Sequence, residues 1–203
     1  MNELQNWRQV KIGDILIIKD EVSIRDALEK EHAVDGIRTE VINITTIHND
    51  STEWRIFEAK GIQTYFVLVK SIDEDFDLRV YQQNDWFQQG TRGDVLRNNH
   101  YFIFEEPVGN WIPKNLEYSA SFGLTVNGED ITFSRKSPTI YGQSNRIPAA
   151  LNEYSTDKNI DSPEILLYEL GGVKNGEMQD IGGWITFLEG RNVRLDEVEI
   201  LAI

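Results

Sequence analysis

Short runs of β-branched and aromatic residues recur along the chain and constrain its fold more than any other feature. Val, Ile, Thr, Phe and Tyr favour strands because their side chains pack well on a pleated surface, and polar or glycine-containing breaks bound such runs. The first set of runs comprises DILII (14–18), TEVINITTI (39–47), EWRIFEA (53–59), TYFVLVK (64–70) and LRVYQQ (78–83). This succession predicts a meander of antiparallel strands.

A second set of strand-forming runs follows in the C-terminal part of the chain. Its members are SASFGLTVNG (119–128), EDITFSR (129–135), EILLYEL (164–170), GWITFLEG (183–190) and VRLDEVEILAI (193–203). Between the two sets, residues 107–117 contain two prolines and a glycine, which are typical of a connector. The sequence therefore predicts a mainly β protein with two small antiparallel barrels or sandwiches, formed by an N-terminal half (1–106) and a C-terminal half (118–203).

Two segments between these runs differ in character. Residues 23–34 predict one short helix, because Ser23 can cap its first turn and Gly36 follows its end. Residues 140–163 are polar and rich in turn-forming residues. For this second segment we expect a long loop, with a short helix over PAALNEY (148–154) as the alternative.

Two stretches of the chain resemble each other, DSTEWRIFEAKG (50–61) and DSPEILLYELGG (161–172). They are identical at five aligned positions, and each falls on a predicted strand in the middle of its half. Comparing all windows of a chain yields such matches by chance, and true repeat architectures normally have three or more copies. The position of the two stretches is nevertheless an argument for a pseudo-repeat of two similar halves.

The charge of the chain excludes some classes of partner. It has 34 acidic and 20 basic residues, for a formal net charge of −14, which repels nucleic-acid phosphates and anionic lipid surfaces. We therefore expect no direct nucleic-acid binding. The charge indicates either a cationic partner, such as a basic protein surface, a polyamine or a metal ion, or solubility alone, which the scattering of the acidic residues favours. We predict a protein partner. No apolar run approaches the roughly 20 residues of a membrane helix, so no membrane span is predicted. The lack of cysteine and of a signal-peptide pattern predicts a cytoplasmic protein.

Sequence signatures of catalysis and metal binding are absent. The chain contains no phosphate-binding glycine motif, and its histidines have no zinc-ligand spacing. Asp73, Asp75 and Asp77 have the spacing that opens a calcium loop, but Leu78 stands where such a loop requires glycine, so we interpret them as an acidic hairpin turn. We predict no catalytic residue, no metal and no cofactor, and the sequence favours a protein that is not an enzyme.

A group of aromatic residues at the end of the first half is the candidate binding site. Aromatic rings interleaved with glutamines are found where surfaces hold peptides or carbohydrates by stacking and amide hydrogen bonds. The alternative is that these rings are core residues or cross-strand pairs, as is usual in β proteins. The candidate binding residues are Tyr81, Trp86, Phe87, Tyr101 and Trp111.

The strand pattern resembles an uncharacterised bacterial family, domain of unknown function 4178. The resemblance lies in VKIGDILII (10–18), EWRIFEAKG (53–61), LTVNGEDITF (124–133), EILLYELGG (164–172) and VRLDEVEILAI (193–203). It implies a β-rich cytoplasmic protein with no established activity, and it supplies no functional residues. The segments 23–34 and 140–163 are insertions relative to this pattern.

Three functions remain open from the sequence. The leading hypothesis is a non-enzymatic, acidic accessory protein that engages another protein, with its contact near Trp86 and Trp111. The second is an acidic inhibitor that mimics the charge of nucleic acid, which requires rows of carboxylates on one face. The third is an enzyme that uses a carboxylate pair or a histidine base such as His48, because burial can raise the pKa of a carboxyl group to suit a general acid.

Overall fold

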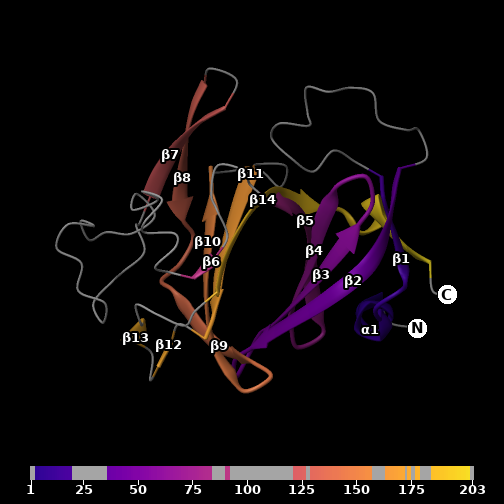
Figure 1. The fold of residues 1–203 in the computed structure, drawn as a ribbon, viewed down its shortest axis with the longest axis horizontal. Coiled ribbons are helices and arrows are strands. Elements are labelled where there is room, and N and C mark those ends of the chain that lie inside the picture. The colour runs from indigo at the N-terminus through magenta and orange to yellow at the C-terminus, as the bar shows by residue number, and fades with distance from the viewer. Residues whose placement is uncertain are drawn as a thin grey trace. The chain divides into compact units, whose positions relative to one another are not determined.

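In the computed structural model, strands predominate among the described residues, as the sequence predicted (Figure 1). The described residues are 3–19, 36–83, 90–91, 121–126, 129–156, 163–171, 173–174, 177–178 and 184–201. They include one α-helix, α1 (Glu3–Gln9), and it is neither long nor apolar enough to cross a membrane. The chain forms two compact units, unit 1 with residues 1–83 and 190–203, and unit 2 with residues 84–189.

Unit 1 contains the predicted antiparallel meander. Its strands lie in the order β15-β1-β2-β3-β4-β5-β14, and pairing from β1 to β5 is antiparallel between neighbours in sequence. The strands are β1 (Ile15–Ile18), β2 (Ile37–His48), β3 (Glu53–Lys60), β4 (Thr64–Ile72), β5 (Asp75–Gln83), the last four residues of β14 (Trp184–Val193), and β15 (Val198–Leu201).

The core of unit 1 lies between α1 and one face of this sheet. Leu4 and Trp7, three residues apart on α1, are buried against apolar side chains that alternate along the strands. The rings of Trp7 and Phe57 are 5.8 Å apart between centroids. The strand residues of this cluster include Leu16, Val41, Phe57, Ala59, Val67, Val69, Leu78, Val80 and Val198. Sequence analysis missed α1 because seven residues with two apolar positions are too few to show a helical period.

Short polar turns connect β2 to β3 and β4 to β5. Asp73 and Glu74 separate β4 from β5, and Asp73 has a φ of 55°, a conformation that Asp tolerates better than most residues. The hairpin turn predicted from the DEDFD sequence is confirmed at Asp73, whereas Asp75 and Asp77 lie on β5. Between β2 and β3, the Asn49 side chain accepts hydrogen bonds from the backbone N–H groups of Ser51 and Thr52.

Unit 2 is built around β10 and β11, which pair antiparallel over seven residues. Strands lie in the order β14-β11-β10-β8-β7, with β9 beside β10 and β6 beside β14. A separate two-stranded pair is formed by β12 (Val173–Lys174) and β13 (Glu177–Met178). The remaining strands are β6 (Gly90–Thr91), β7 (Ser121–Val126), β8 (Glu129–Arg135), β9 (Ile140–Ser144), β10 (Ile147–Ser155), β11 (Pro163–Leu170) and residues 184–189 of β14.

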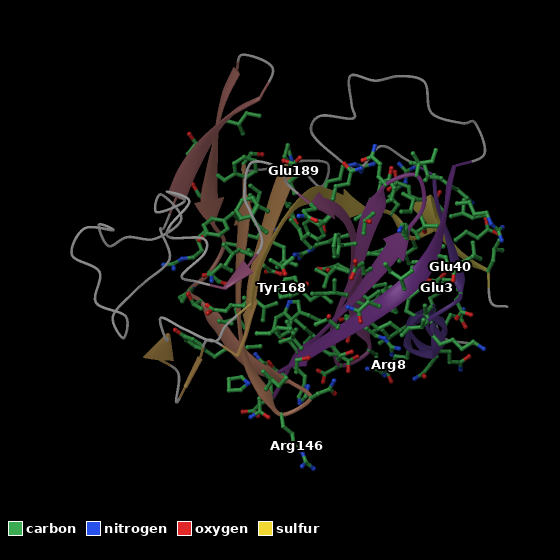
Figure 2. The ribbon with its side chains drawn as sticks, viewed as in Figure 1. Glu3, Arg8, Glu40, Arg146, Tyr168 and Glu189 are labelled. Carbon is green, nitrogen blue, oxygen red and sulfur yellow. The ribbon has the colours of Figure 1, made fainter. Side chains whose placement is uncertain are left out.

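The prediction of a long loop or a short helix within residues 140–163 is wrong for the part of that segment that the structure describes, residues 140–156 and 163. The segment forms β9 and β10, joined by a two-residue turn at Asn145 and Arg146, from which Arg146 projects (Figure 2). Ala, Leu and Glu in PAALNEY favour a helix by intrinsic propensity. Both faces of β10 are buried from Ala149 to Tyr154, so pairing and burial in unit 2 override that propensity.

Several predictions about organisation stay predictions. The helix over 23–34 and the connector over 107–117 lie outside the described residues. The predicted division into halves 1–106 and 118–203 is therefore not tested. The compact units differ from these halves, because unit 1 also includes residues 190–203. The stretches 50–61 and 161–172 do contain strands, β3 and β11, as expected, but the pseudo-repeat itself remains a prediction.

We predict that Gly190→Ala strongly destabilises unit 1. A Cβ atom at Gly190 would lie 2.0 Å from the carbonyl oxygen of Val80 and 2.6 Å from Cα of Tyr81, and backbone atoms cannot move aside cheaply. We expect a loss of about 3 kcal/mol in the free energy of unfolding, measured by urea denaturation. The control is Gly13→Ala, where φ is 96° but no atom lies within 4 Å of the added Cβ; it should cost only about 1–2 kcal/mol. An equal or smaller loss for Gly190→Ala would contradict the close approach.

Candidate functional site

The structure describes only one of the five candidate aromatic residues. Tyr81 lies on β5 with 1% of its surface exposed, so its ring packs in the interior. Trp86, Phe87, Tyr101 and Trp111 lie outside the described residues. The aromatic binding surface therefore stays a prediction.

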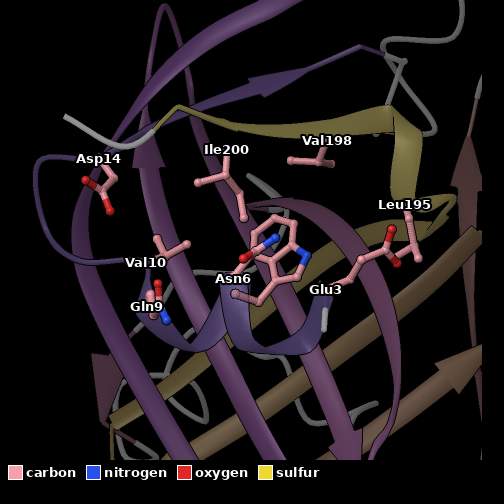
Figure 3. Close-up of a pocket in the computed structure, with 9 residues that line it drawn as sticks. Glu3, Asn6, Gln9, Val10, Asp14, Leu195, Val198 and Ile200 are labelled. Carbon is pink, nitrogen blue, oxygen red and sulfur yellow. The ribbon is translucent and has the colours of Figure 1, made fainter. Parts of the chain in front are cut away.

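A cavity of about 350 Å³ in unit 1 lies between α1 and β15 (Figure 3). We call this cavity the α1–β15 groove. Its residues come from α1 and the turn after it, from β15, and from the 3-10 helix η5 (Leu195–Glu197) that precedes β15. The lining residues are Glu3, Asn6, Trp7, Gln9, Val10, Asp14, Leu195, Val198 and Ile200.

The groove has an apolar floor and a polar rim. Trp7, Val10 and Val198 form part of the floor and are each at most 5% exposed. Glu3, Asn6 and Gln9 form the rim on α1, where a spacing of three residues places them on one side of the helix. All three are exposed. The groove can therefore accept a side chain with an apolar stem and a polar or cationic end.

Asp14 closes one end of the groove as a buried carboxylate. Asp14 is only 2% exposed, and its Oδ2 atom accepts a hydrogen bond of 2.9 Å from the backbone N–H of Lys11. The backbone on each side is also tied down, because Gly13 donates to the Val41 carbonyl at 2.8 Å and Val41 donates to the Asp14 carbonyl at 2.9 Å. Asp14 is thus held in place by the pairing of its own chain segment with β2.

Arg55 on β3 fixes the C-terminal end of α1. Its guanidinium donates hydrogen bonds to the backbone carbonyls of Arg8, at 2.8 Å, and Val10, at 2.9 Å. These carbonyls lie where a helix leaves its last C=O groups without intrahelical partners. The same guanidinium lies 5.3 Å from the ring centroid of Phe57. Arg55 therefore positions the helix that forms one wall of the groove.

Burial lowers the pKa of Arg55 from its ordinary value, and the nearby positive charge of Arg8 lowers it further, while Glu53 raises it. Arg8 itself lies 3.8 Å from the Glu53 carboxylate (Figure 2). Because an arginine stays protonated even with a lowered pKa, the guanidinium remains charged at neutral pH. Its two carbonyl acceptors are therefore bonded to a permanent cation.

The backbone of β15 forms the opposite wall of the groove. Among the described strands, β15 pairs with β1 alone, so its other edge is unpaired within the described residues. Lys19 donates to the Glu197 carbonyl at 2.7 Å, and the register continues with Ile17 opposite Glu199. In an antiparallel ladder, successive residues turn their N–H and C=O groups alternately toward and away from the partner strand. Glu197 and Glu199 therefore bond to β1, and the backbone groups of Val198 and Ile200 point away from it.

An ion-pair cluster holds the turn before β15. The Glu197 carboxylate lies 3.7 Å from Arg191 and 3.6 Å from Arg194, and it also accepts a hydrogen bond from the Arg194 backbone N–H. Glu197 is 6% exposed, so its charge needs these partners. The turn leaves Leu195 42% exposed at the mouth of the groove.

The residues expected for the catalytic alternative do not meet in this groove. His48 is exposed at the end of β2 and does not line it. Unit 2 buries the carboxylates of Glu153, Glu164, Glu169 and Glu189, of which Glu164 forms an ion pair with Lys136. In the part of the chain that the structure describes, no group of three or more acidic or histidine side chains could hold a metal ion.

No protein-family model, curated protein or solved structure matches this chain. The resemblance to domain of unknown function 4178 stays a prediction. Sequence analysis missed the groove because its residues come from both ends of the chain, and only the pairing of β1 with β15 brings those ends together. The available signal was the combination of an amphipathic segment at residues 3–10 with a strand at residues 198–201. Neither segment alone indicates that the two line a common groove.

We predict that Arg55→Met loosens α1 and widens the groove. The methionine keeps an apolar stem but leaves the carbonyls of Arg8 and Val10 without their donor, which should cost about 1–2 kcal/mol of stability. Hydrogen exchange of the α1 amides, followed by NMR, should accelerate relative to the wild type. Arg38→Met is the matched control, because Arg38 is an exposed arginine on β2 of the same unit. Unchanged exchange in Arg55→Met would show that Arg55 does not position the helix.

Proposed function

We propose that this chain is a non-enzymatic binding protein that holds a cationic segment of another protein in the α1–β15 groove. The observation that carries the proposal is the groove itself, a cavity of about 350 Å³ with an apolar floor and a rim of carboxylates and amides. Its volume lies within the range of about 300–1,000 Å³ that is usual for ligand sites in proteins. The contact expected near Trp86 and Trp111 lies outside the described residues. We propose instead that the partner binds in the α1–β15 groove.

The charge of the groove supports a cationic ligand. Glu3 and Asp14 contribute carboxylates to the lining, and none of the described lining residues is a lysine or arginine. The whole chain carries a formal net charge of −14, which attracts basic surfaces over a distance of about 10 Å at 0.1 M salt. Local and overall charge therefore favour the same class of partner.

The chemistry of the lining supports binding rather than catalysis. The amides of Asn6 and Gln9 are exposed groups that can donate and accept hydrogen bonds, but they do not exchange protons near neutral pH. Trp7 is only 5% exposed, and it contributes the exposed part of its ring to an apolar floor on which an alkyl chain can rest. A long side chain that ends in a positive charge satisfies both the floor and the rim.

The proposal predicts that filling the groove abolishes partner capture. In Asn6→Trp a bulky ring enters the groove from the rim, whereas Gln5→Trp places the same ring on α1 at an exposed residue outside the lining. Wild type and both variants are immobilised and incubated with lysate of the native cell at low and at high salt. The same proteins should bind wild type and Gln5→Trp at low salt, be absent from Asn6→Trp, and be lost at high salt.

Capture of the same proteins by Asn6→Trp would place the contact elsewhere and contradict the proposal. Retention of the partner at high salt would contradict its cationic character. Circular dichroism of the three proteins must be identical, so that loss of capture reports on the groove and not on folding.

A further inference from the structure

We propose that the cationic segment binds in extended form, as an added strand on the free edge of β15, with a lysine or arginine side chain in the α1–β15 groove. This inference rests on the proposed function, because it takes the cationic partner from it. It adds the conformation of the ligand, the strand that it pairs with and the direction of its side chains.

The first step is the hydrogen-bonding capacity of β15. The N–H and C=O groups of Val198 and Ile200 point away from β1, because Lys19 bonds to Glu197 and the ladder alternates from there. The pairing of β1 with β2 agrees, because the Val41 backbone N–H donates to the Asp14 carbonyl. By alternation, the backbone groups of Leu16 and Ile18 point toward β2. Those of Ile17 and Lys19 point toward β15. A free strand edge of this kind is a template for another extended chain.

The second step is the direction of the side chains. Val198 and Ile200 line the groove, and Figure 3 shows both on the side of β15 that faces α1. Residues directly opposite each other in an antiparallel pair point to the same face of the sheet. The residues of an added strand that lie opposite Val198 and Ile200 therefore also point toward α1 and the groove.

The third step is the match between the groove and a cationic side chain. Figure 3 shows Glu3, Asn6 and Gln9 in a row along α1, and Trp7, Val198 and Ile200 line the same groove. Lysine and arginine bury their alkyl stems on apolar surface while the charged end stays near water. The stem lies on the floor, and the charge lies against the Glu3 carboxylate at the exposed rim.

A second copy of this chain is the other candidate occupant of the edge. Two copies would pair β15 with β15 across a two-fold axis, as free edges often do. Each copy carries a formal net charge of −14, and like charges oppose such an approach. The observations therefore favour a cationic peptide over self-association.

The test uses the full chain labelled with ¹⁵N and a synthetic peptide, acetyl-Thr-Val-Lys-Val-Lys-Val-Thr-amide, in which the lysines share one face of the strand. At low salt, titration should shift the amide signals of Val198 and Ile200 and of α1, with nuclear Overhauser effects between peptide backbone protons and β15. Replacing both lysines by glutamate should weaken binding by at least about tenfold. Methylating the backbone nitrogens of the two lysines removes the donors that face Val198 and Ile200, because directly opposite residues of a hydrogen-bonded pair exchange both N–H···O bonds, and it should also weaken binding by about tenfold.

The outcomes separate the two proposals. If the methylated peptide binds as tightly as the parent, and only the glutamate peptide is weak, strand addition is wrong and a cationic ligand in the groove stands. If the shifts lie away from β15, or if no peptide binds, the inference is overturned, while the capture experiment with Asn6→Trp still judges the proposed function. Shifts at β15 that grow with protein concentration and without peptide would assign the edge to a second copy instead.

Discussion

Arg55 makes the interaction on which the arrangement of unit 1 depends most. A short helix has little stability of its own, and α1 stays on the sheet because Arg55 bonds to the carbonyls at its C-terminal end while Leu4 and Trp7 are buried beneath it. With the helix fixed on one side and β15 paired to β1 on the other, a gap remains between them. The groove is thus a consequence of how the two ends of the chain are held, and a shift of either would close or open it.

The sequence predicted the strands of unit 1 well because their signals are local. EWRIFEA and TYFVLVK became β3 and β4 with nearly the expected ends, since β-branched and aromatic residues fill both runs and polar turns bound them. The acidic turn at Asp73 was predicted for the same reason. In PAALNEY the local signal and the tertiary context disagree, and the buried position of β10 in unit 2 decided the outcome.

The candidate site could not be predicted in the same way. Arg55 is one polar residue in a strand, and nothing in the neighbouring sequence indicates that it reaches the carbonyls of Arg8 and Val10, more than 40 residues away in the chain. Likewise, the sequence around Val198 and Ile200 is that of an ordinary strand. Their backbone groups pair with no other described strand, and this follows only from the register with β1. The aromatic cluster that composition suggested is represented among the described residues by Tyr81, which is buried.

The free edge of β15 beside α1 is the central claim, and amide hydrogen exchange in the unliganded protein tests it most directly. The Glu199 backbone N–H points toward β1, whereas the N–H groups of its neighbours Val198 and Ile200 point away from β1. The Glu199 amide is therefore an internal control for the other two. The amides of Val198 and Ile200 should exchange at least about tenfold faster than the amide of Glu199. Equal protection of all three amides would show that another segment already covers the edge, and would contradict the account.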